Sequence, residues 1–135
     1  HVANSQKLIR VVENQRGAPT SASLIAKVTT KILADINQHE KDSYSGVYNL
    51  CASGNTNWYA YAKFIFESDS DHSNRSTDMP FSIKPIPASD FQSEARRPEN
   101  SLLDTNKITS MFGVELPCWS DGVVNTLDRL KLCNP

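Results

Sequence analysis

A short stretch of the sequence combines two cations with polar donors on a stiff backbone. Residues 96–101 read Arg-Arg-Pro-Glu-Asn-Ser. Guanidinium groups bind phosphate oxygens in a bidentate way, and nearby amide and hydroxyl groups suit a sugar. An isolated Arg-Arg pair is more often part of a solvated loop in which arginines pair with surface acids. Taken alone, the stretch leaves two interpretations open: a solvated loop, or a site for a phosphate or a sugar with Arg97, Asn100 and Ser101 as candidates and Arg96 as a weaker neighbour.

A second pair of residues has the spacing of a catalytic motif. Tyr59 and Lys63 match the Tyr-x-x-x-Lys pattern by which short-chain dehydrogenases place a phenol and an ammonium group on one helix face. In such enzymes the ammonium group helps the phenol to donate or accept a proton. Aromatic and basic residues at this spacing are also common on amphipathic helices. We therefore interpret this pair as the polar side of a packed helix and predict no catalytic residue in the segment.

Other chemical motifs are missing from the sequence. The five glycines never fall at the spacing of a dinucleotide-binding turn or a P-loop, and there is no G-x-S-x-G or H-E-x-x-H pattern. His1, His39 and His72 have no partners at ligand spacing, which predicts no metal site. A faint calcium-loop pattern fails at the required glycine, which is Asn74, and at the required glutamate, which is Pro80.

Composition restricts the class of protein further. With 135 residues, 39% of them hydrophobic, the chain suits one ordinary domain or a piece of a larger protein. A net charge of -1 gives no field that would attract nucleic acid, and no apolar run approaches the roughly 20 residues that span a bilayer. Cys51, Cys118 and Cys133 are odd in number and lack a C-x-x-C pair. We expect reduced thiols, a cytoplasmic location, and neither a nucleic-acid nor a membrane partner.

The elements that position the candidate residues alternate between strand and helix. Leu8–Val12 is predicted as a strand, and Gly46–Cys51 as a second one. Between them a helix begins after a cap at Thr20 or Ser21. The apolar face of this helix has a residue at every fourth position, namely Leu24, Val28, Ile32 and Ile36.

The second half of the chain repeats the alternation. Thr56 or Asn57 is expected to cap a helix, whose apolar side is Trp58, Tyr61, Ala62, Ile65 and Phe66. A polar loop over 67–78 then leads to an edge strand at Phe81–Pro87, which its two prolines exclude from a sheet centre.

Two further helices are predicted after the arginine stretch. The first is capped by Asp104 or Thr105 and ends at Gly113 in a left-handed conformation. The second begins near Ser120. Its expected buried residues are Val123, Val124, Leu127 and Leu130. The element order predicts an α/β fold.

Four sequence motifs, in this order, resemble those of the C-terminal part of dTDP-4-dehydrorhamnose reductases. The motifs are Val11–Thr20, Gly46–Gly54 with Trp58, Arg97–Thr105, and Phe112–Pro117 with Trp119. The resemblance extends from about Lys7 to Lys131, and four ordered motifs are far more specific than one. There are two departures: Arg16 stands where the family usually has an aromatic residue, and Cys118 where an acid commonly precedes the tryptophan.

The resemblance implies a fold and an activity. The family consists of extended short-chain dehydrogenases that reduce the 4-keto group of dTDP-4-dehydro-L-rhamnose with NADPH or NADH. Residues 1–135 would form a single α/β segment, the small mixed α/β substrate-binding part that also completes a Rossmann-like domain. The glycine-rich turn and the catalytic residues would lie in an N-terminal dinucleotide-binding half outside this sequence. The segment alone would then bind no cofactor and have no activity.

The resemblance also implies which residues bind the nucleotide-sugar. Gln15 and Gly17 would lie at a cleft between the two halves, and Arg97 with Asn100 and Ser101 would face the sugar nucleotide and its diphosphate. Two other functions stay open: a non-catalytic regulatory or scaffold subunit with this fold, and a reductase or epimerase of another nucleotide-sugar. A homodimer stays open as well.

Overall fold

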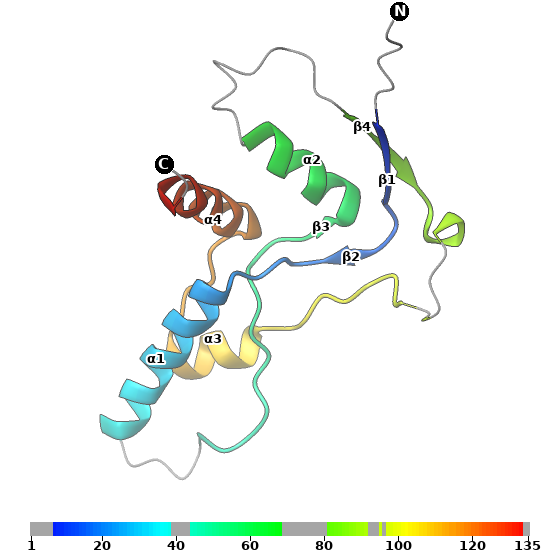
Figure 1. The fold of residues 1–135 in the computed structure, drawn as a ribbon. Helices are drawn as coiled ribbons and strands as arrows, with labels where there is room; N and C mark the ends of the chain where they lie inside the picture. Colours follow the sequence, from blue (N-terminus) through cyan, green and yellow to red (C-terminus); the bar gives the residue numbers. More distant parts are fainter. Residues whose placement is uncertain (1–6, 39–43, 69–80, 92–94, 96, 134–135) are drawn as a thin grey trace, which may run out of the picture. The chain divides into compact units, whose positions relative to one another are not determined.

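The computed structural model shows helices combined with two small sheets (Figure 1). It describes residues 7–38, 44–68, 81–91, 95 and 97–133. The chain divides into two compact units, each of which is built from two separate stretches. Unit 1 consists of His1–Gly17 and Thr56–Ser101, and unit 2 consists of Ala18–Asn55 and Leu102–Pro135.

The larger sheet of unit 1 is a pair of parallel strands. Strand β1 (Lys7–Val12) pairs with β4 (Phe81–Ile86), in a register that places Val12 opposite Ile86. Both of these residues are buried, and the two strands run side by side in Figure 1. The structure therefore confirms both predicted strands. Pro85 lies within β4, where a missing N–H is tolerated because each strand has only one partner among the described residues.

Unit 1 also contains the helix that carries the Tyr-x-x-x-Lys spacing. Helix α2 (Trp58–Ser68) follows the two-residue strand β3 (Thr56–Asn57), which pairs antiparallel with β2 (Arg16–Gly17). Asn57 is the cap, because its Oδ1 accepts a hydrogen bond from the backbone N–H of Ala60 at 2.7 Å. No residue of α2 is buried, and Trp58 is 51% exposed. The expected loop over 67–78 falls mostly outside the described residues.

Unit 2 begins with the helix that the sequence predicts most clearly. Helix α1 spans Ala22–Gln38, and Ser21 caps it by accepting a hydrogen bond from the Leu24 N–H at 3.2 Å. The neighbouring Thr20 hydroxyl serves another purpose, since it accepts a bond from the N–H of Ala52 at 3.0 Å. Of the predicted apolar face, Leu24 and Val28 are buried and Ile32 packs against the core, whereas Ile36 is 38% exposed.

The C-terminal stretch of unit 2 forms two more helices. Helix α3 (Asn106–Phe112) ends at Gly113, which has φ 55° and ψ 36° in the left-handed region. Thr105, one of the two predicted caps, is the N-cap residue but makes no side-chain cap hydrogen bond. Asp104, one residue earlier, accepts a hydrogen bond at its Oδ1 from the N–H of Asn106 at 2.8 Å. Helix α4 spans Trp119–Cys133.

A turn of 3-10 helix, η2 (Ala88–Asp90), belongs to unit 1 and follows β4.

Two predictions about unit 2 are wrong. Gly46–Cys51 forms no strand: its backbone pairs with no strand among the described residues, and side chains hold it instead. Lys107 Nζ donates to the Val47 carbonyl at 3.1 Å and lies 4.4 Å from the ring centre of Tyr48. On α4, Val123 is buried but Val124 and Leu130 are 41% and 54% exposed. Successive helix residues point about 100° apart, so Val124 does not share the direction of Val123.

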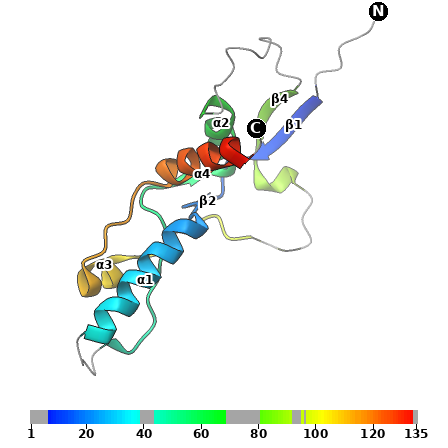
Figure 2. The ribbon, with the colours of Figure 1, turned by 60° about the vertical axis from the view of Figure 1, so that its left-hand side comes forward.

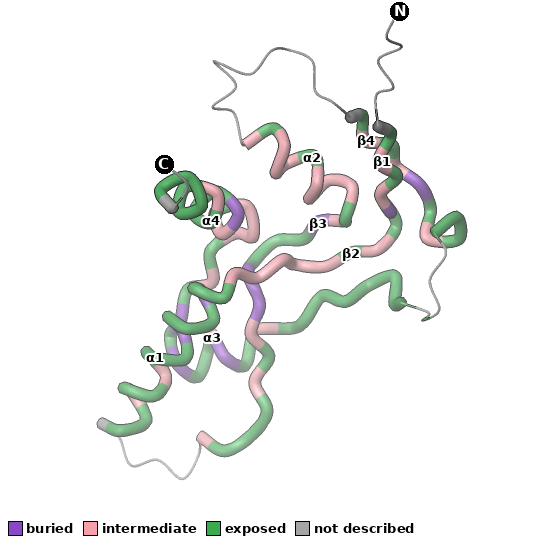
Figure 3. The backbone as a smooth tube through the Cα atoms, in the orientation of Figure 1, coloured by how far each residue is buried: buried purple, intermediate pink, exposed green. Residues whose placement is uncertain are grey.

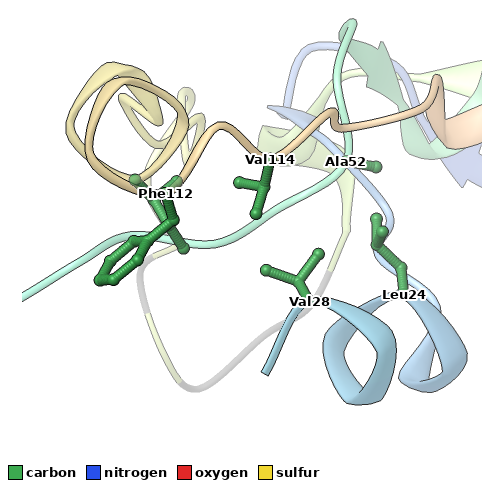
Figure 4. Close-up of a cluster of buried hydrophobic side chains, with 6 residues drawn as sticks. Leu24, Val28, Ala52, Phe112 and Val114 are labelled. Carbon is green, nitrogen blue, oxygen red and sulfur yellow. The ribbon is translucent and has the colours of Figure 1, made fainter. Parts of the chain in front are cut away.

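The core of unit 2 forms where α1, α3 and the segment before Ser53 meet. Its buried residues are Leu24, Val28, Ala52, Ile108, Phe112 and Val114. Val28 and Val114 point toward each other in the close-up, with Phe112 to one side (Figure 4). The burial map shows these positions as the purple parts of α1, α3 and the adjoining segments (Figure 3). In a second view α3 again lies beside α1 (Figure 2).

Candidate functional site

Backbone hydrogen bonds place the two predicted site segments next to each other in unit 1. The N–H of Arg16 donates to the Glu99 carbonyl at 2.7 Å, and the N–H of Ser101 donates to the Arg16 carbonyl at 3.0 Å. Arg16 and Asn100 therefore form a parallel β-bridge. On its other side Arg16 pairs with Asn57 of β3. We call this three-stranded arrangement of Arg16–Gly17, Thr56–Asn57 and Glu99–Ser101 the Arg16 ladder.

The ladder places the predicted site residues on two different faces. Directly paired residues share a face of a sheet, and successive residues of a strand alternate between faces. Gly17 and Ser101 are on one face: a Cβ built on Gly17 would lie 3.0 Å from Ser101 Oγ. Arg16 and Asn100 are on the other. The sequence predicts Gly17, Asn100 and Ser101 as one group, and the structure brings them together but separates their side chains by face.

Ser101 has a contact that the sequence does not reveal. Its hydroxyl donates to the Arg16 carbonyl at 2.9 Å, beside the bond from its own N–H to the same oxygen. The hydroxyl proton is therefore engaged within the protein, and what Oγ can offer a ligand is a lone pair. Ser101 fixes the backbone of the turn at Gly17. A Cβ at position 17 would lie 3.0 Å from Ser101 Oγ, so the serine side chain would have to shift for a larger residue to fit.

The remaining predicted residues are accessible. Arg97 is exposed, and within the described part of the chain its guanidinium group makes no hydrogen bond or ion pair. Gln15 is half-buried and precedes β2 directly. Asn100 is exposed and has an interaction partner in the structure. Arg96, the weaker candidate, lies outside the described residues.

The Tyr-x-x-x-Lys pair has the surroundings of an ordinary helix surface. Lys63 Nζ lies 3.6 Å from Glu67 Oε1, one turn further along α2, and both side chains are more than half exposed. Tyr59 is half-buried. An exposed lysine paired with a glutamate four residues later is a common stabilising contact of isolated helices. The absence of a catalytic role for Tyr59 and Lys63 stays a prediction.

Unit 2 contributes a shallow hollow that the sequence does not predict. An open cavity of about 630 Å³ lies among α1, the segment before α4 and α4 itself. Lys27, Lys31 and Arg129 line it together with Glu115, and Lys31 Nζ donates to the Gly113 carbonyl at 2.8 Å. None of the predicted site residues lines it. We therefore do not include this cavity in the candidate site.

The described part of the chain contains free thiols but no cluster of metal-ligating side chains. No group of three or more His, Cys, Asp or Glu side chains that could hold a metal ion occurs there. His1, His39 and His72 lie outside it. Cys51 and Cys118 are free thiols, Cys51 buried and Cys118 half-buried. No helix among the described residues is long and apolar enough to cross a membrane.

Fold and site together define a class of protein. The candidate site offers guanidinium, amide and backbone groups, which suit an anionic, hydroxylated ligand. Such groups on a mixed fold are those of a candidate binding site in an α/β protein. The sequence model of one family, described as the RmlD substrate binding domain, matches residues 1–132. The chain belongs to this family, which confirms the resemblance of its motifs to the reductases.

Individual relatives carry the name of one enzyme. The chain is 35% identical over 133 residues to a dTDP-4-dehydrorhamnose reductase of Escherichia coli K12, covering 96% of the chain and 42% of the relative. It is 34% identical over 120 residues to the enzyme of that name from Burkholderia thailandensis, covering 87% of the chain and 40% of the relative. The chain thus spans about two fifths of the length of these relatives.

Solved structures show the same fold. A dTDP-4-dehydrorhamnose reductase from Clostridium acetobutylicum superposes with a TM-score of 0.74 at 23% identity, over 94% of this chain and 40% of that one. The reductase from Bacillus anthracis, solved in complex with NADP, gives a TM-score of 0.67 at 25% identity, over 95% and 39% of the two chains. The predicted fold class, a mixed α/β part of this reductase fold, is confirmed.

Proposed function

We propose that this chain is the C-terminal, substrate-recognition part of a reductase that converts dTDP-4-dehydro-L-rhamnose to dTDP-L-rhamnose with NADPH or NADH. The family match and the shared name of the relatives support this assignment. The structural observation that carries it is the Arg16 ladder, which joins the Gln15–Gly17 turn to the Asn100–Ser101 segment. These backbone bonds hold two segments that are far apart in the sequence next to each other in unit 1.

Each proposed site residue has a role suited to its surroundings. Arg97, exposed and without a protein partner among the described residues, supplies charge to the diphosphate. Asn100 supplies an amide at the open face of the ladder, and Gln15 reaches the sugar from the start of β2. Gly17 and Ser101 shape the turn between them. None of these residues performs the chemical step.

The nicotinamide cofactor does not fit the residues of this chain. Its phosphates need a glycine-rich turn between a strand and a helix, and β1 is followed here by Glu13–Gln15 and the short strand β2. We infer that a dinucleotide-binding half supplies the cofactor and the acid–base residues in the complete enzyme. The chain alone is then inactive. A cytoplasmic location, in keeping with the two free thiols, and a homodimer belong to the same proposal.

Replacing Arg97 by alanine tests the site in the complete enzyme. Loss of a charge-assisted contact to phosphate should cost about 1.5–3 kcal/mol of binding, which raises the KM for dTDP-4-dehydro-L-rhamnose roughly tenfold to a hundredfold. NADPH oxidation followed at several substrate concentrations measures this change. Arg10→Ala is the matched control, because it removes the same charge from an exposed position of β1. An unchanged KM in the Arg97 variant would remove this residue from the site.

A further inference from the structure

Several hydrogen bonds and two pairing partners fix the backbone of Arg16. Its N–H donates to the Glu99 carbonyl, and its carbonyl accepts bonds from both the N–H and the hydroxyl of Ser101. Its other edge pairs with Asn57. The side chain has no part in these contacts: it is exposed and makes no hydrogen bond or ion pair within the described residues. The guanidinium group of Arg16 is therefore a positive charge on a backbone that hydrogen bonds hold in place.

The face of the ladder that carries Arg16 is the open one. On the opposite face Thr56 is buried, and Ser101 Oγ lies close against Gly17. Asn57 and Asn100 are the direct partners of Arg16 on its two sides, so all three side chains lie in one row on the open face. The row therefore consists of a guanidinium group with an amide on each side.

Arg16 and residues 97–100 carry two cations and one acid. Glu99 precedes Asn100 directly and is exposed. Arg97 lies three residues before Asn100 and is exposed. A guanidinium group that is free of protein carboxylates can bind two phosphate oxygens at once. Arg16 in the row and Arg97, three residues from Asn100 in the sequence, provide two guanidinium groups, which suit a diphosphate better than a single phosphate.

We propose that Arg16 is a specificity-determining residue that contacts the diphosphate of the nucleotide-sugar together with Arg97 and Asn100. The inference rests on the proposed function for the identity of the ligand. Both the nucleotide-sugar and the cofactor of the complete enzyme contain a diphosphate. The sugar nucleotide is the ligand we assign, because Arg16 is bonded to the segment that carries Arg97 and Asn100.

The test compares ligands that differ in their phosphates. In the complete enzyme, Arg16→Met keeps an unbranched apolar stem and removes the guanidinium group with its charge. Calorimetry with dTDP, thymidine and NADP⁺ should show a loss of dTDP affinity of roughly tenfold to a hundredfold. Thymidine and NADP⁺ should bind as they do to the unchanged enzyme. Arg10→Met is the control that removes an exposed charge elsewhere in unit 1 and should leave all three affinities unchanged.

Three results would overturn the assignment. Unchanged dTDP affinity in Arg16→Met would show that the side chain makes no contact. An equal loss for thymidine would show that the substitution disturbs the site rather than a phosphate contact. A loss of affinity for NADP⁺ alone would show that the Arg16 side chain contacts the cofactor and not the nucleotide-sugar. Failure of the unchanged enzyme to bind dTDP would count instead against the proposed function. Because the structural contacts of Arg16 use its backbone, the variant should keep its thermal midpoint.

Discussion

Replacing Phe112 by alanine should lower the free energy of unfolding by about 3–5 kcal/mol, the range measured for truncating a buried aromatic residue. Phe112 is 7% exposed and belongs to the core cluster of unit 2. The Tyr44 ring stacks on it at 5.4 Å between centroids, and the Tyr48 ring meets it edge-on at 5.2 Å. Alanine therefore removes buried area and two aromatic contacts, and leaves a cavity that α1 and α3 cannot close.

Urea unfolding of the complete enzyme, followed by fluorescence and circular dichroism, measures this effect. Met111→Ala is the matched control, because Met111 is the preceding residue of α3 and is 41% exposed. It should cost less than about 1 kcal/mol. Equal losses for the two variants would contradict the core as described, since the difference depends on the burial of one side chain and not of the other.

Replacing Gly54 by alanine should give the second largest loss in the free energy of unfolding, after Phe112→Ala. Gly54 has φ +79°, a backbone conformation that costs a residue with a Cβ about 1–2 kcal/mol. A Cβ there would also lie 3.3 Å from Trp119 Cδ1 and 3.4 Å from Cys118 Sγ. Crowding in a packed site adds about 1–3 kcal/mol. The backbone cannot move away easily, because the neighbouring Ser53 bonds in both directions to the segment containing Pro117 and Trp119.

Gly113→Ala separates the two causes. Gly113 also has a positive φ, +55°, but a Cβ there would meet nothing within 4 Å. We expect this variant to lose about 1–2 kcal/mol through backbone strain alone. The difference between the two variants, read from their thermal or urea midpoints, then reports the crowding at Trp119. If both variants lost the same stability, the close approach of Gly54 to Trp119 would be refuted.

Local signals in the sequence were enough to predict the helices. Ser21 and Asn57 each provide the side-chain oxygen that a helix start needs, and Gly113 provides the left-handed residue that ends α3. The fourfold spacing of Leu24 and Val28 identified the buried face of α1. These features depend on residues within one or two turns of each other, and so they are visible in the order of the amino acids.

Long-range pairing was not predictable in the same way. Gly46–Cys51 has the composition of a strand but no neighbouring strand to pair with among the described residues, so composition alone predicted it wrongly. The bridge between Arg16 and Asn100 joins residues more than 80 positions apart, and no local pattern indicates it. The sequence could therefore suggest that Gly17, Asn100 and Ser101 belong to one site, but not that Asn100 shares a face with Arg16.

NADPH oxidation with dTDP-4-dehydro-L-rhamnose is the measurement that tests the central claim most directly. It should be made with this chain alone and with the chain joined to a dinucleotide-binding half. We predict no turnover by the chain alone, because its residues bind the substrate and perform no chemistry, and turnover when the other half is present. Turnover by the chain alone would contradict this division of roles, and no turnover by the joined protein would contradict the proposed function.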